Sequence, residues 1–368
     1  MPNVIEPSPY SGTTPLASPS ELIGVTSSTE GEWRRMAHRY KIRDIAQQSG
    51  LSKATVDRVL NRRAGVRDST RAEVMQAIAD LDKQRSQLRL NGRRYLIDVV
   101  MEAPGRFSDA FRAAVENELP TFAPAVLRAR FHLWEQGPPT RMLETLARIR
   151  ASHGVVLKAP DEPAVAEAID TLTASGVPVV TYTTDVPNSR RCAYVGIDNR
   201  AAGVTAAYLV QQWLGPALSD VLVTLSRNVF RGEEEREAGF RTGLRGSGRE
   251  IITVSDTDGS INDNLLRALE EHPSLQATYS IGGGNAATFA AFDRLGVHCR
   301  VFIAHDLDAD NRRLLRAGRI SAVLHNDLCA DARKALQLIL QARGVLPAEP
   351  ARPTPVQIVS PYNMPPAR

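Results

Sequence analysis

Few residues of this chain are spaced for catalysis. The run Ile281-Gly-Gly-Gly-Asn285 could cradle a phosphate, and the adjacent His305 and Asp306 could act as acid–base partners. The glycine run has neither the Gly-x-x-x-x-Gly-Lys-[Ser/Thr] nor the Gly-x-Gly-x-x-Gly spacing of phosphate-binding loops, so it predicts a tight turn before a helix. The His-Asp pair has neither a nucleophile elbow nor a metal-ligand cluster beside it. The sequence therefore predicts no catalytic residues.

The cysteines do not build a site either. Cys192, Cys299 and Cys329 are far apart, odd in number and without metal-ligand spacing. They predict no disulfide framework, no metal and no cofactor, and are typical of small buried residues in a reduced, cytoplasmic protein.

Positive charge is concentrated in one short segment. Residues 34–95 contain 16 Lys and Arg against 6 Asp and Glu, a balance of +10, whereas the whole chain carries +4 and the remainder therefore −6. Such a segment is typical of a part that meets nucleic-acid phosphates while the rest of the molecule stays clear of them.

The N-terminal residues have the composition of a disordered tail. Residues 1–30 are rich in Pro, Ser and Thr and lack the basic cluster and apolar run of a signal peptide, so we interpret residues 1–35 as a disordered tail. Met36 is an alternative start to Met1. No later apolar stretch approaches the length of a membrane span, so we expect no contact with a membrane.

Residues 36–82 predict a three-helix domain with a helix-turn-helix. Apolar residues recur with helical periodicity, and Ser52 and Ser69-Thr70 are expected N-caps of the second and third helices. Ala46 is small enough for two helices to approach, Gly50 suits the turn, and Val56 packs the second helix on the first. A generic helical hairpin is the alternative, which the basic charge disfavours.

This segment resembles the headpiece of the lactose-repressor (LacI) family of DNA-binding regulators. The matching residues are Asp44-Ile-Ala46, Gly50-Leu-Ser52, Thr55-Val-Asp-Arg58-Val-Leu-Asn61, and Val66 with Thr70-Arg71. The resemblance implies that the second helix enters the major groove of double-stranded DNA.

The resemblance also assigns roles to individual residues. Base reading falls to Lys53, Ala54 and Arg58, since Lys and Arg can donate to guanine and Ala54 can touch a thymine methyl. Phosphate contacts fall to Ser52, Thr55, Asn61 and Arg63. Asp57 stands where the family commonly has Ser, and it either positions Arg58 or repels phosphate.

The connector that follows, residues 83–94, departs from the family. It lacks the Pro of the usual Tyr-x-Pro-Asn signature and is about three residues short of the leucine-bearing hinge helix that inserts into the minor groove. Leu88 or Leu90 could still act as the wedge, and an arginine-rich linker that contacts phosphates is the alternative.

The remaining segment, residues 95–364, predicts an α/β domain. Short apolar runs alternate with amphipathic stretches, a pattern typical of βαβ units in parallel sheets with helices on both faces. The runs are Tyr95–Met101, Gly154–Leu157, Val177–Tyr182, Val221–Leu225, Ile251–Val254, Thr278–Ile281, Val301–Ala304 and Ile320–Leu324. So many strands favour two sheets, and hence two lobes with a cleft between them.

The strand–helix order resembles the type I periplasmic-binding-protein fold, Rossmann-like with parallel sheets, which the LacI family uses as its effector domain. The first lobe is expected at about 94–210 and 324–354, and the second at about 211–323 and 355–364, with a C-terminal strand near Val356–Val359. By this resemblance, Asp198 and Asp306 accept hydrogen bonds from ligand hydroxyls and Arg236 donates to them. Asn285 and Asn326 are assigned amide contacts, and Phe107 an aromatic wall. Each could instead be an N-cap, an ion pair or ordinary packing.

Such a set of side chains suits a sugar or polyol, which offers many paired donors and acceptors. A nucleoside or purine is the second choice, disfavoured by an aromatic content of 5%, and an enzyme acting on a sugar is the least favoured. The expectation is a bacterial, nucleoid-associated regulator, most simply a repressor. It would bind a palindromic operator as a homodimer, since one headpiece covers only a half-site.

Overall fold

The computed structural model describes residues 40–366, apart from 91, 139, 217–218, 227–229 and 256–260. The expected tail, residues 1–35, lies outside them. The chain divides into two compact units, residues 1–85 and 86–368. Each unit has its own hydrophobic core and is described by itself.

The N-terminal unit is the expected three-helix domain, formed by α2 (Ile42–Ser49), α3 (Lys53–Leu60) and α4 (Asp68–Leu90). Gly50 ends α2 in the left-handed conformation with φ 71°, as the turn requires. Ala46 and Val56 are both buried in the core of this unit, where they meet Ile45, Val59 and residues of α4. The helix-turn-helix prediction is therefore confirmed.

The third helix is much longer than expected. It begins at Asp68, so Ser69 and Thr70 lie in its first turn and not at its cap, and it continues to Leu90 through most of the expected connector. Residues 83–90 contain Lys, Gln, Arg, Leu and one Ser but no Gly or Pro, so nothing in them ends a helix. The break comes at Gly92, with φ 70°.

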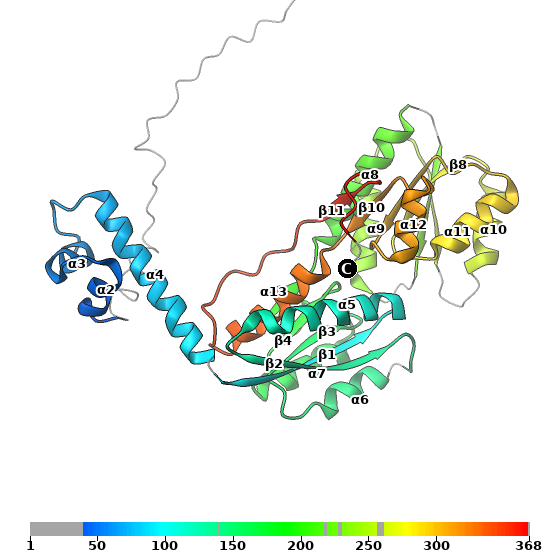
Figure 1. Ribbon diagram of the computed structural model, residues 1–368. Helices are drawn as coiled ribbons and strands as arrows, with labels where there is room; N and C mark the ends of the chain where they lie inside the picture. The colour runs from blue at the N-terminus through cyan, green and yellow to red at the C-terminus, as the bar shows by residue number, and fades with distance from the viewer. Residues whose placement is uncertain are drawn as a thin grey trace, which may run out of the picture. The chain divides into compact units, whose positions relative to one another are not determined.

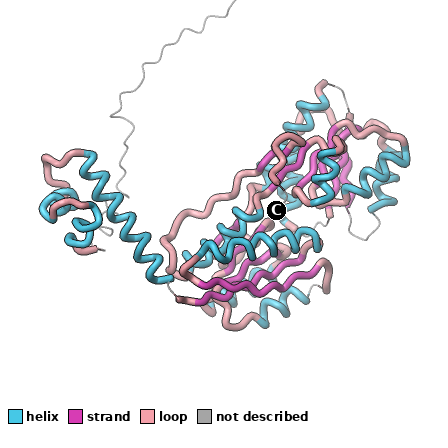
Figure 2. Tube along the Cα trace, viewed as in Figure 1, coloured by secondary structure: helices cyan, strands magenta, loops and turns pink. Residues whose placement is uncertain are grey.

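The first lobe is a five-stranded parallel sheet covered by helices on both faces (Figures 1 and 2). The strand order is β2-β1-β3-β4-β5. Its strands are β1 (Arg94–Glu102), β2 (Val126–Trp134), β3 (Gly154–Lys158), β4 (Val179–Tyr182) and β5 (Ala193–Val195). One face packs on α5 (Gly105–Glu118) and α13 (Leu328–Ala342), and the other on α6 (Thr140–Arg148) and α7 (Pro163–Ala174). A 3₁₀ turn, η1 (Leu119–Phe122), precedes β2.

The second lobe is a six-stranded sheet in the order β11-β10-β9-β8-β6-β7, parallel except for β11. Its strands are β6 (Asp220–Leu225), β7 (Ile251–Ser255), β8 (Leu275–Ser280), β9 (Val301–His305), β10 (Ala322–His325) and β11 (Gln357–Val359). Helices α8 (Asn199–Leu214) and α9 (Arg231–Gly243) cover one face. The other carries α10 (Ile261–Glu271), α11 (Asn285–Leu295) and α12 (Ala309–Arg316).

The chain crosses between the lobes three times, and the first crossing lies earlier than expected. The apolar side of α8, with Ala202, Ala206 and Val210, is buried against the second sheet, so the first lobe ends near residue 197 and not 210. The second crossing separates β10 from α13, and the third leads from α13 to β11 (Figure 1). Ile197, at the first crossing, forms an isolated parallel β-bridge with Thr354, at the third.

Two glycines let α8 and α9 cross at close range. A Cβ atom on Gly203 would lie 2.0 Å from the Arg236 carbonyl oxygen, and one on Gly239 would lie 2.1 Å from that of Arg200. Both obstacles are backbone atoms, so neither can give way without separating the helices. No helix in the described part of the chain is long and apolar enough to cross a bilayer.

We expect Gly239→Ala to destabilise the second lobe by about 1–3 kcal/mol, because the added methyl group would collide with the Arg200 backbone and α9 would have to shift. Chemical denaturation of the full chain would measure the free energy of unfolding. Ala201→Ser is the control, since it adds one atom at an exposed position of α8. Equal stability of Gly239→Ala and wild type would contradict this account of the crossing.

Candidate functional site

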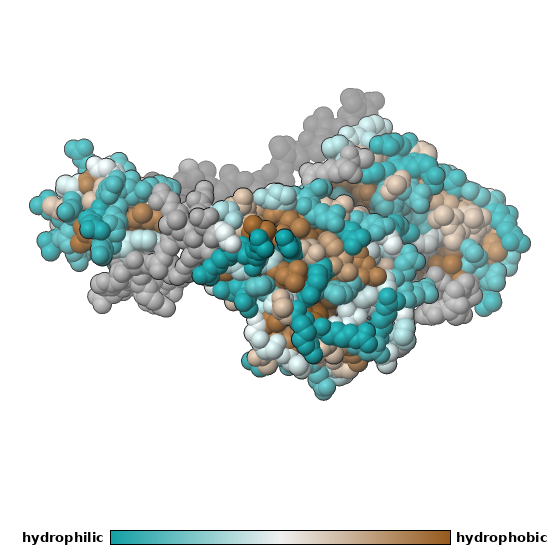
Figure 3. All heavy atoms as spheres, turned by 60° about the horizontal axis from the view of Figure 1, so that its bottom comes forward, coloured by the Kyte–Doolittle hydropathy of each residue, from teal (hydrophilic) through white to brown (hydrophobic). Residues whose placement is uncertain are grey.

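The helix α3 presents cationic side chains to solvent. Its N-cap is Ser52, whose hydroxyl accepts from the Thr55 amide at 3.1 Å and hydrogen-bonds the Thr55 hydroxyl at 2.8 Å. Lys53, Ala54 and Arg58 are exposed. Neither cationic side chain makes a hydrogen bond or ion pair with the described part of the chain, so both can bind an external partner. Most of the visible surface of this unit is hydrophilic (Figure 3).

The unusual Asp57 contacts the end of its own helix and the residues beyond it. The Asn61 amide nitrogen donates to its carboxylate at 2.8 Å, and the Arg63 guanidinium lies 3.6 Å from it. In this arrangement Asp57 binds the neutral side-chain amide of Asn61 and offsets the charge of Arg63, which are two of the four expected phosphate contacts. No hydrogen bond or ion pair within the described part of the chain joins it to the Arg58 side chain. Leu88 and Leu90 belong to α4, but their side chains lie outside the described residues.

The second candidate site is a cavity between the two lobes, with a volume of about 130 Å³. It lies where open α/β sheets bind ligands, at the carboxyl ends of the strands. It is smaller than pockets for drug-sized ligands, which are typically about 300–1,000 Å³. Its polar lining comes from both lobes: Arg106, Lys158, Thr183, Thr184, Ser226, Glu233, Arg236, Asp306, Asp308 and His325.

Three of the six expected ligand residues line this cavity, namely Phe107, Arg236 and Asp306. Phe107 stacks on Tyr182, with ring centroids 6.2 Å apart. Asp306 follows β9 with φ 62°, and Thr183 follows β4 with φ 65°. A non-glycine residue in this region costs about 1–3 kcal/mol, and such strain concentrates at functional sites.

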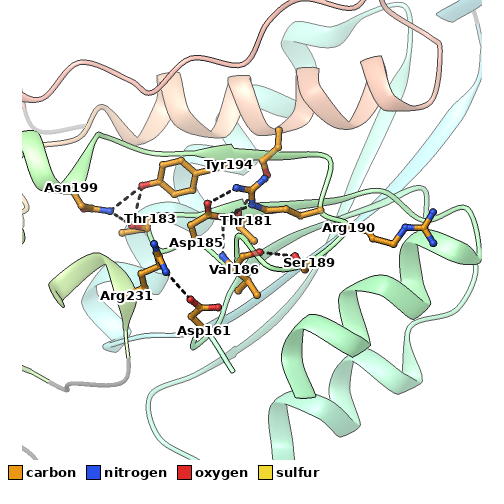
Figure 4. A network of polar contacts seen from close by, with 12 residues as sticks. Asp161, Thr181, Thr183, Asp185, Val186, Ser189, Arg190, Tyr194, Asn199 and Arg231 are labelled. Carbon is orange, nitrogen blue, oxygen red and sulfur yellow. Dashed lines mark hydrogen bonds and ion pairs between the residues drawn. The ribbon is translucent and has the colours of Figure 1, made fainter. Parts of the chain in front are cut away.

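Arg236 is held by a buried network that joins the lobes. Its Nε donates to the Asn199 side-chain oxygen at 2.8 Å, and its Nη1 lies 3.5 Å from the Ile281 carbonyl oxygen. The amide nitrogen of Asn199 in turn donates to the Thr183 carbonyl at 3.1 Å and the Tyr194 hydroxyl at 3.2 Å (Figure 4). Asn199 therefore positions Arg236 and ties it to a strand end of the first lobe.

The other three expected ligand residues lie elsewhere. Asp198 is the exposed N-cap of α8 and accepts from the Ala201 amide at 2.9 Å. Asn285 begins α11 and hydrogen-bonds Ser280 and Asn311. Asn326 is buried, 1% exposed, near the second crossing. None of them is among the residues that line the cavity. For Asp198, the structure shows the N-cap that the sequence offered as the alternative to a ligand contact.

The structure adds cavity residues that the sequence did not single out. Lys158 ends β3, Thr184 follows β4, Phe230 precedes α9 and His325 ends β10. The position of Lys158, as a cation ending an otherwise apolar strand, is the one signal that could have identified it. Phe230 and Thr184 are ordinary loop residues, and only tertiary packing brings them to the cavity.

Of the residues weighed as catalytic, His305 and the glycine run have structural roles. His305 is buried and hydrogen-bonds the Tyr279 hydroxyl at 2.8 Å, and burial holds its pKa well below the ordinary value. It does not line the cavity, unlike its neighbour Asp306. Gly282, in the glycine run, also lines the cavity. A Cβ atom on it would lie 2.1 Å from the Ser226 backbone nitrogen, so only glycine fits there. The glycine run is the expected turn before a helix.

Polar contacts across the cleft hold the lobes together around the cavity. Arg106 of the first lobe pairs with Asp308 of the second at 2.9 Å. Arg231 of α9 pairs with Asp161, which follows β3, at 3.1 Å (Figure 4). The Gly232 amide donates to the Thr184 hydroxyl at 3.1 Å. A molecule in the cavity would thus be enclosed by both lobes.

Near the crossings lies a buried carboxyl group, that of Asp331 in the first turn of α13. It is fully buried, and its oxygens make no hydrogen bond of normal geometry within the described residues. Burial raises the pKa of Asp331 to about 7, the Asp327 carboxylate adds to the rise, and the Thr354 hydroxyl opposes it. The group is therefore at least partly protonated at neutral pH.

Two family models match the chain. One, for bacterial regulatory proteins of the lacI family, matches residues 41–84, and the other, a periplasmic binding protein domain, matches residues 140–344. No curated protein matches the chain significantly.

Several solved structures share the fold of the larger unit. A glucose–galactose binding protein, GanP, from Geobacillus stearothermophilus is 19% identical with a TM-score of 0.65, over 74% of this chain and 99% of that one. A putative LacI transcriptional regulator from Bacteroides fragilis is 15% identical with a TM-score of 0.65, over 74% and 98%. A solute binding protein from Burkholderia graminis, in complex with D-arabinose, is 19% identical with a TM-score of 0.64, over 74% and 97%.

The pKa of Asp331 predicts a pH-dependent stability. Because this pKa rises from 3.8 to about 7 on folding, its contribution to stability is present below pH 4 and is lost as the pH rises through 7. Asp331→Asn stays neutral, so its stability relative to wild type should increase between pH 4 and 8 by up to about 4 kcal/mol.

Urea unfolding at several pH values would measure this difference, with Asp310→Asn as a control at an exposed aspartate paired with Arg313. A constant difference between Asp331→Asn and wild type across that range would show that Asp331 is ionised throughout.

Proposed function

We propose that this chain, which belongs to the periplasmic binding protein domain family and carries a LacI-family DNA-binding domain, is a repressor that binds a palindromic operator and responds to a small sugar or polyol. Such regulators are not enzymes. Because its partner is operator DNA, the protein acts at the bacterial nucleoid, in the cytoplasm.

The observation that carries the effector half of the proposal is the cavity with Arg236 and Asp306 on its wall. An arginine donor and a carboxylate acceptor suit vicinal hydroxyl groups, which both donate and accept hydrogen bonds. The aromatic rings that line the cavity belong to Phe107 and Phe230. The polar groups that share the wall with these two rings can pair with the many hydroxyls of a sugar or polyol, so we favour such a ligand over a nucleoside or purine.

The operator half rests on the exposed cations of α3. A single recognition helix covers one half-site, so useful affinity requires two headpieces related by a two-fold axis, and hence a homodimer. A ligand that contacts both lobes favours their closed arrangement over an open one. A change in that arrangement is the means by which the ligand would alter the affinity for DNA.

Arg58→Ala should weaken binding to the operator by about 1–3 kcal/mol and binding to random DNA little, because a base contact is lost. The operator would first be selected from a random DNA pool, which should yield a two-fold symmetric site. Titrations of both DNAs by fluorescence anisotropy measure the effect. Arg63→Ala is the control, since loss of a phosphate contact weakens both DNAs alike. If Arg58→Ala weakened binding to the operator and to random DNA equally, Arg58 would contact phosphate and not a base.

Arg236→Ala should keep operator binding and lose the response to ligand. Removing the guanidinium leaves ligand hydroxyls and the Asn199 oxygen without a donor, at a cost of about 1–3 kcal/mol per buried group. A thermal-shift screen of sugars and polyols identifies the ligand, and operator titrations with and without it measure the response. The control is Arg241→Ala, on the same helix but exposed and paired with Glu237. An Arg236→Ala protein that responds at the wild-type ligand concentration would place the effector elsewhere.

A further inference from the structure

The amino ends of the strands in the first lobe form an edge rich in arginine. Five segments lead into β1 to β5, and the end of α13 lies beside them; they are residues 92–94, 119–128, 146–153, 173–178, 187–192 and 341–346. Together these segments contain eight Arg and no Asp or Glu. Six of the eight Arg lie outside residues 34–95, in the part of the chain where acids outnumber Lys and Arg. We call this surface the arginine edge.

Hydrogen bonds join the segments of the arginine edge side by side. A guanidinium from β2 donates to the Arg150 carbonyl oxygen, before β3, at 2.9 Å. The Arg343 guanidinium, at the end of α13, donates to the Gly176 carbonyl oxygen, before β4, at 2.7 Å. The Thr173 hydroxyl donates to the Arg190 carbonyl oxygen, before β5, at 3.2 Å. Arginines far apart in the sequence therefore share one surface.

Most of these guanidinium groups have no acidic partner. Arg148 pairs with Glu144, and Arg191 pairs with Asp185. The other six are exposed and lie beyond ion-pair distance of every carboxylate in the described part of the chain: Arg93, Arg94, Arg128, Arg150, Arg190 and Arg343.

The surplus of positive charge does not depend on how one nearby acid is counted. The Asp170 carboxylate accepts from the Arg190 backbone amide at 2.6 Å. The Arg190 side chain itself points away from the network around Asp185 (Figure 4). Even with Asp170 set against Arg190, five guanidinium groups of the arginine edge keep an uncompensated charge.

A surface with arginines and no acids fits a polyanion, because each guanidinium can donate to a phosphate group. The course of the chain favours DNA as that polyanion. Helix α4 of the N-terminal unit ends at Leu90, and β1 begins at Arg94. The linker therefore enters the first lobe at the arginine edge, and it can span no more than about 14 Å. The carboxyl ends of the same strands face the cavity instead.

We propose that the arginine edge of the effector domain is a second DNA contact, which binds backbone phosphates of the duplex that the headpiece holds. Phosphate contacts carry no direct sequence information, so this surface adds affinity and not specificity. The sequence offered an arginine-rich linker as an alternative to a leucine wedge, and this proposal extends the phosphate contacts from the linker to a surface of the first lobe. It deepens the proposed function and rests on its DNA binding.

Arg128→Gln combined with Arg190→Gln tests this contact, because neither side chain makes a hydrogen bond or ion pair within the described part of the chain. Anisotropy titrations of the full chain with the selected operator and with random DNA, at several KCl concentrations, give the slope of log affinity against log salt. Each phosphate contact contributes about 0.9 to that slope, so the double variant should make it shallower by up to about 1.8 on both DNAs.

Two further variants serve as controls. Arg245→Gln combined with Arg316→Gln removes the same charge from exposed positions of the second lobe, and it should keep the wild-type slope. Arg128→Lys combined with Arg190→Lys keeps the charge of the arginine edge and should also keep the slope. A lysine variant as shallow as the glutamine variant would attribute the effect to altered structure and overturn the inference.

The remaining outcomes separate this inference from the function on which it rests. A glutamine variant with the wild-type slope on both DNAs would overturn the DNA contact and leave operator binding in place. If the wild-type chain binds neither DNA, the proposed function falls together with the inference. Sedimentation of each variant gives its oligomeric state. A glutamine variant that sediments as a smaller species than wild type would make the arginine edge an interface between two copies, and would overturn the inference.

Discussion

Parallel strands place their carboxyl ends at one edge of a sheet, and in this protein the edges of two sheets meet at the same cavity. Lys158 ends β3, Thr183 follows β4, Asp306 follows β9 and His325 ends β10. Residues from both lobes and from far apart in the sequence thereby converge on a volume of about 130 Å³. The strained backbone at Thr183 and Asp306 is held in place because each follows directly on a buried strand.

The same arrangement links the cavity to the lobes' crossings. Arg236 in the cavity is bonded to Asn199 at the start of α8, and Asn199 is bonded to the Thr183 carbonyl in the first lobe. The first crossing, at Ile197, lies two residues before Asn199 and pairs with the third crossing at Thr354. The Arg236 guanidinium is thereby joined, through Asn199, to residues beside two of the three crossings.

Local pattern was sufficient for most of the fold. All eight apolar runs form strands, and seven of them lie inside a sheet, where burial on both faces makes them continuously apolar. The eighth, Ile251–Val254, forms the edge strand β7, in which Thr253 is exposed. Two strands were missed: β2, at the sheet edge, carries Arg128, Arg130 and His132 between its apolar residues, and β5 has only three residues. The end of the first lobe was placed too late, because periodicity shows that α8 has an apolar side but not which sheet covers it.

The sequence by itself determined the helix-turn-helix and the alternation of strands and helices, because both follow from local spacing and residue type. Phe107, Arg236 and Asp306 were singled out through the resemblance to the LacI-family effector domain, and all three line the cavity. The tertiary structure alone decided which polar groups share a cavity. Asp198, Asn285 and Asn326 also lie next to strands or crossings, but Asp198 caps a helix, Asn285 bonds Ser280 and Asn311, and Asn326 is buried without lining the cavity. Lys158 and Phe230 are 72 residues apart in sequence and 3.6 Å apart in space, because contact across a cleft depends on how two sheets close, which no local pattern records.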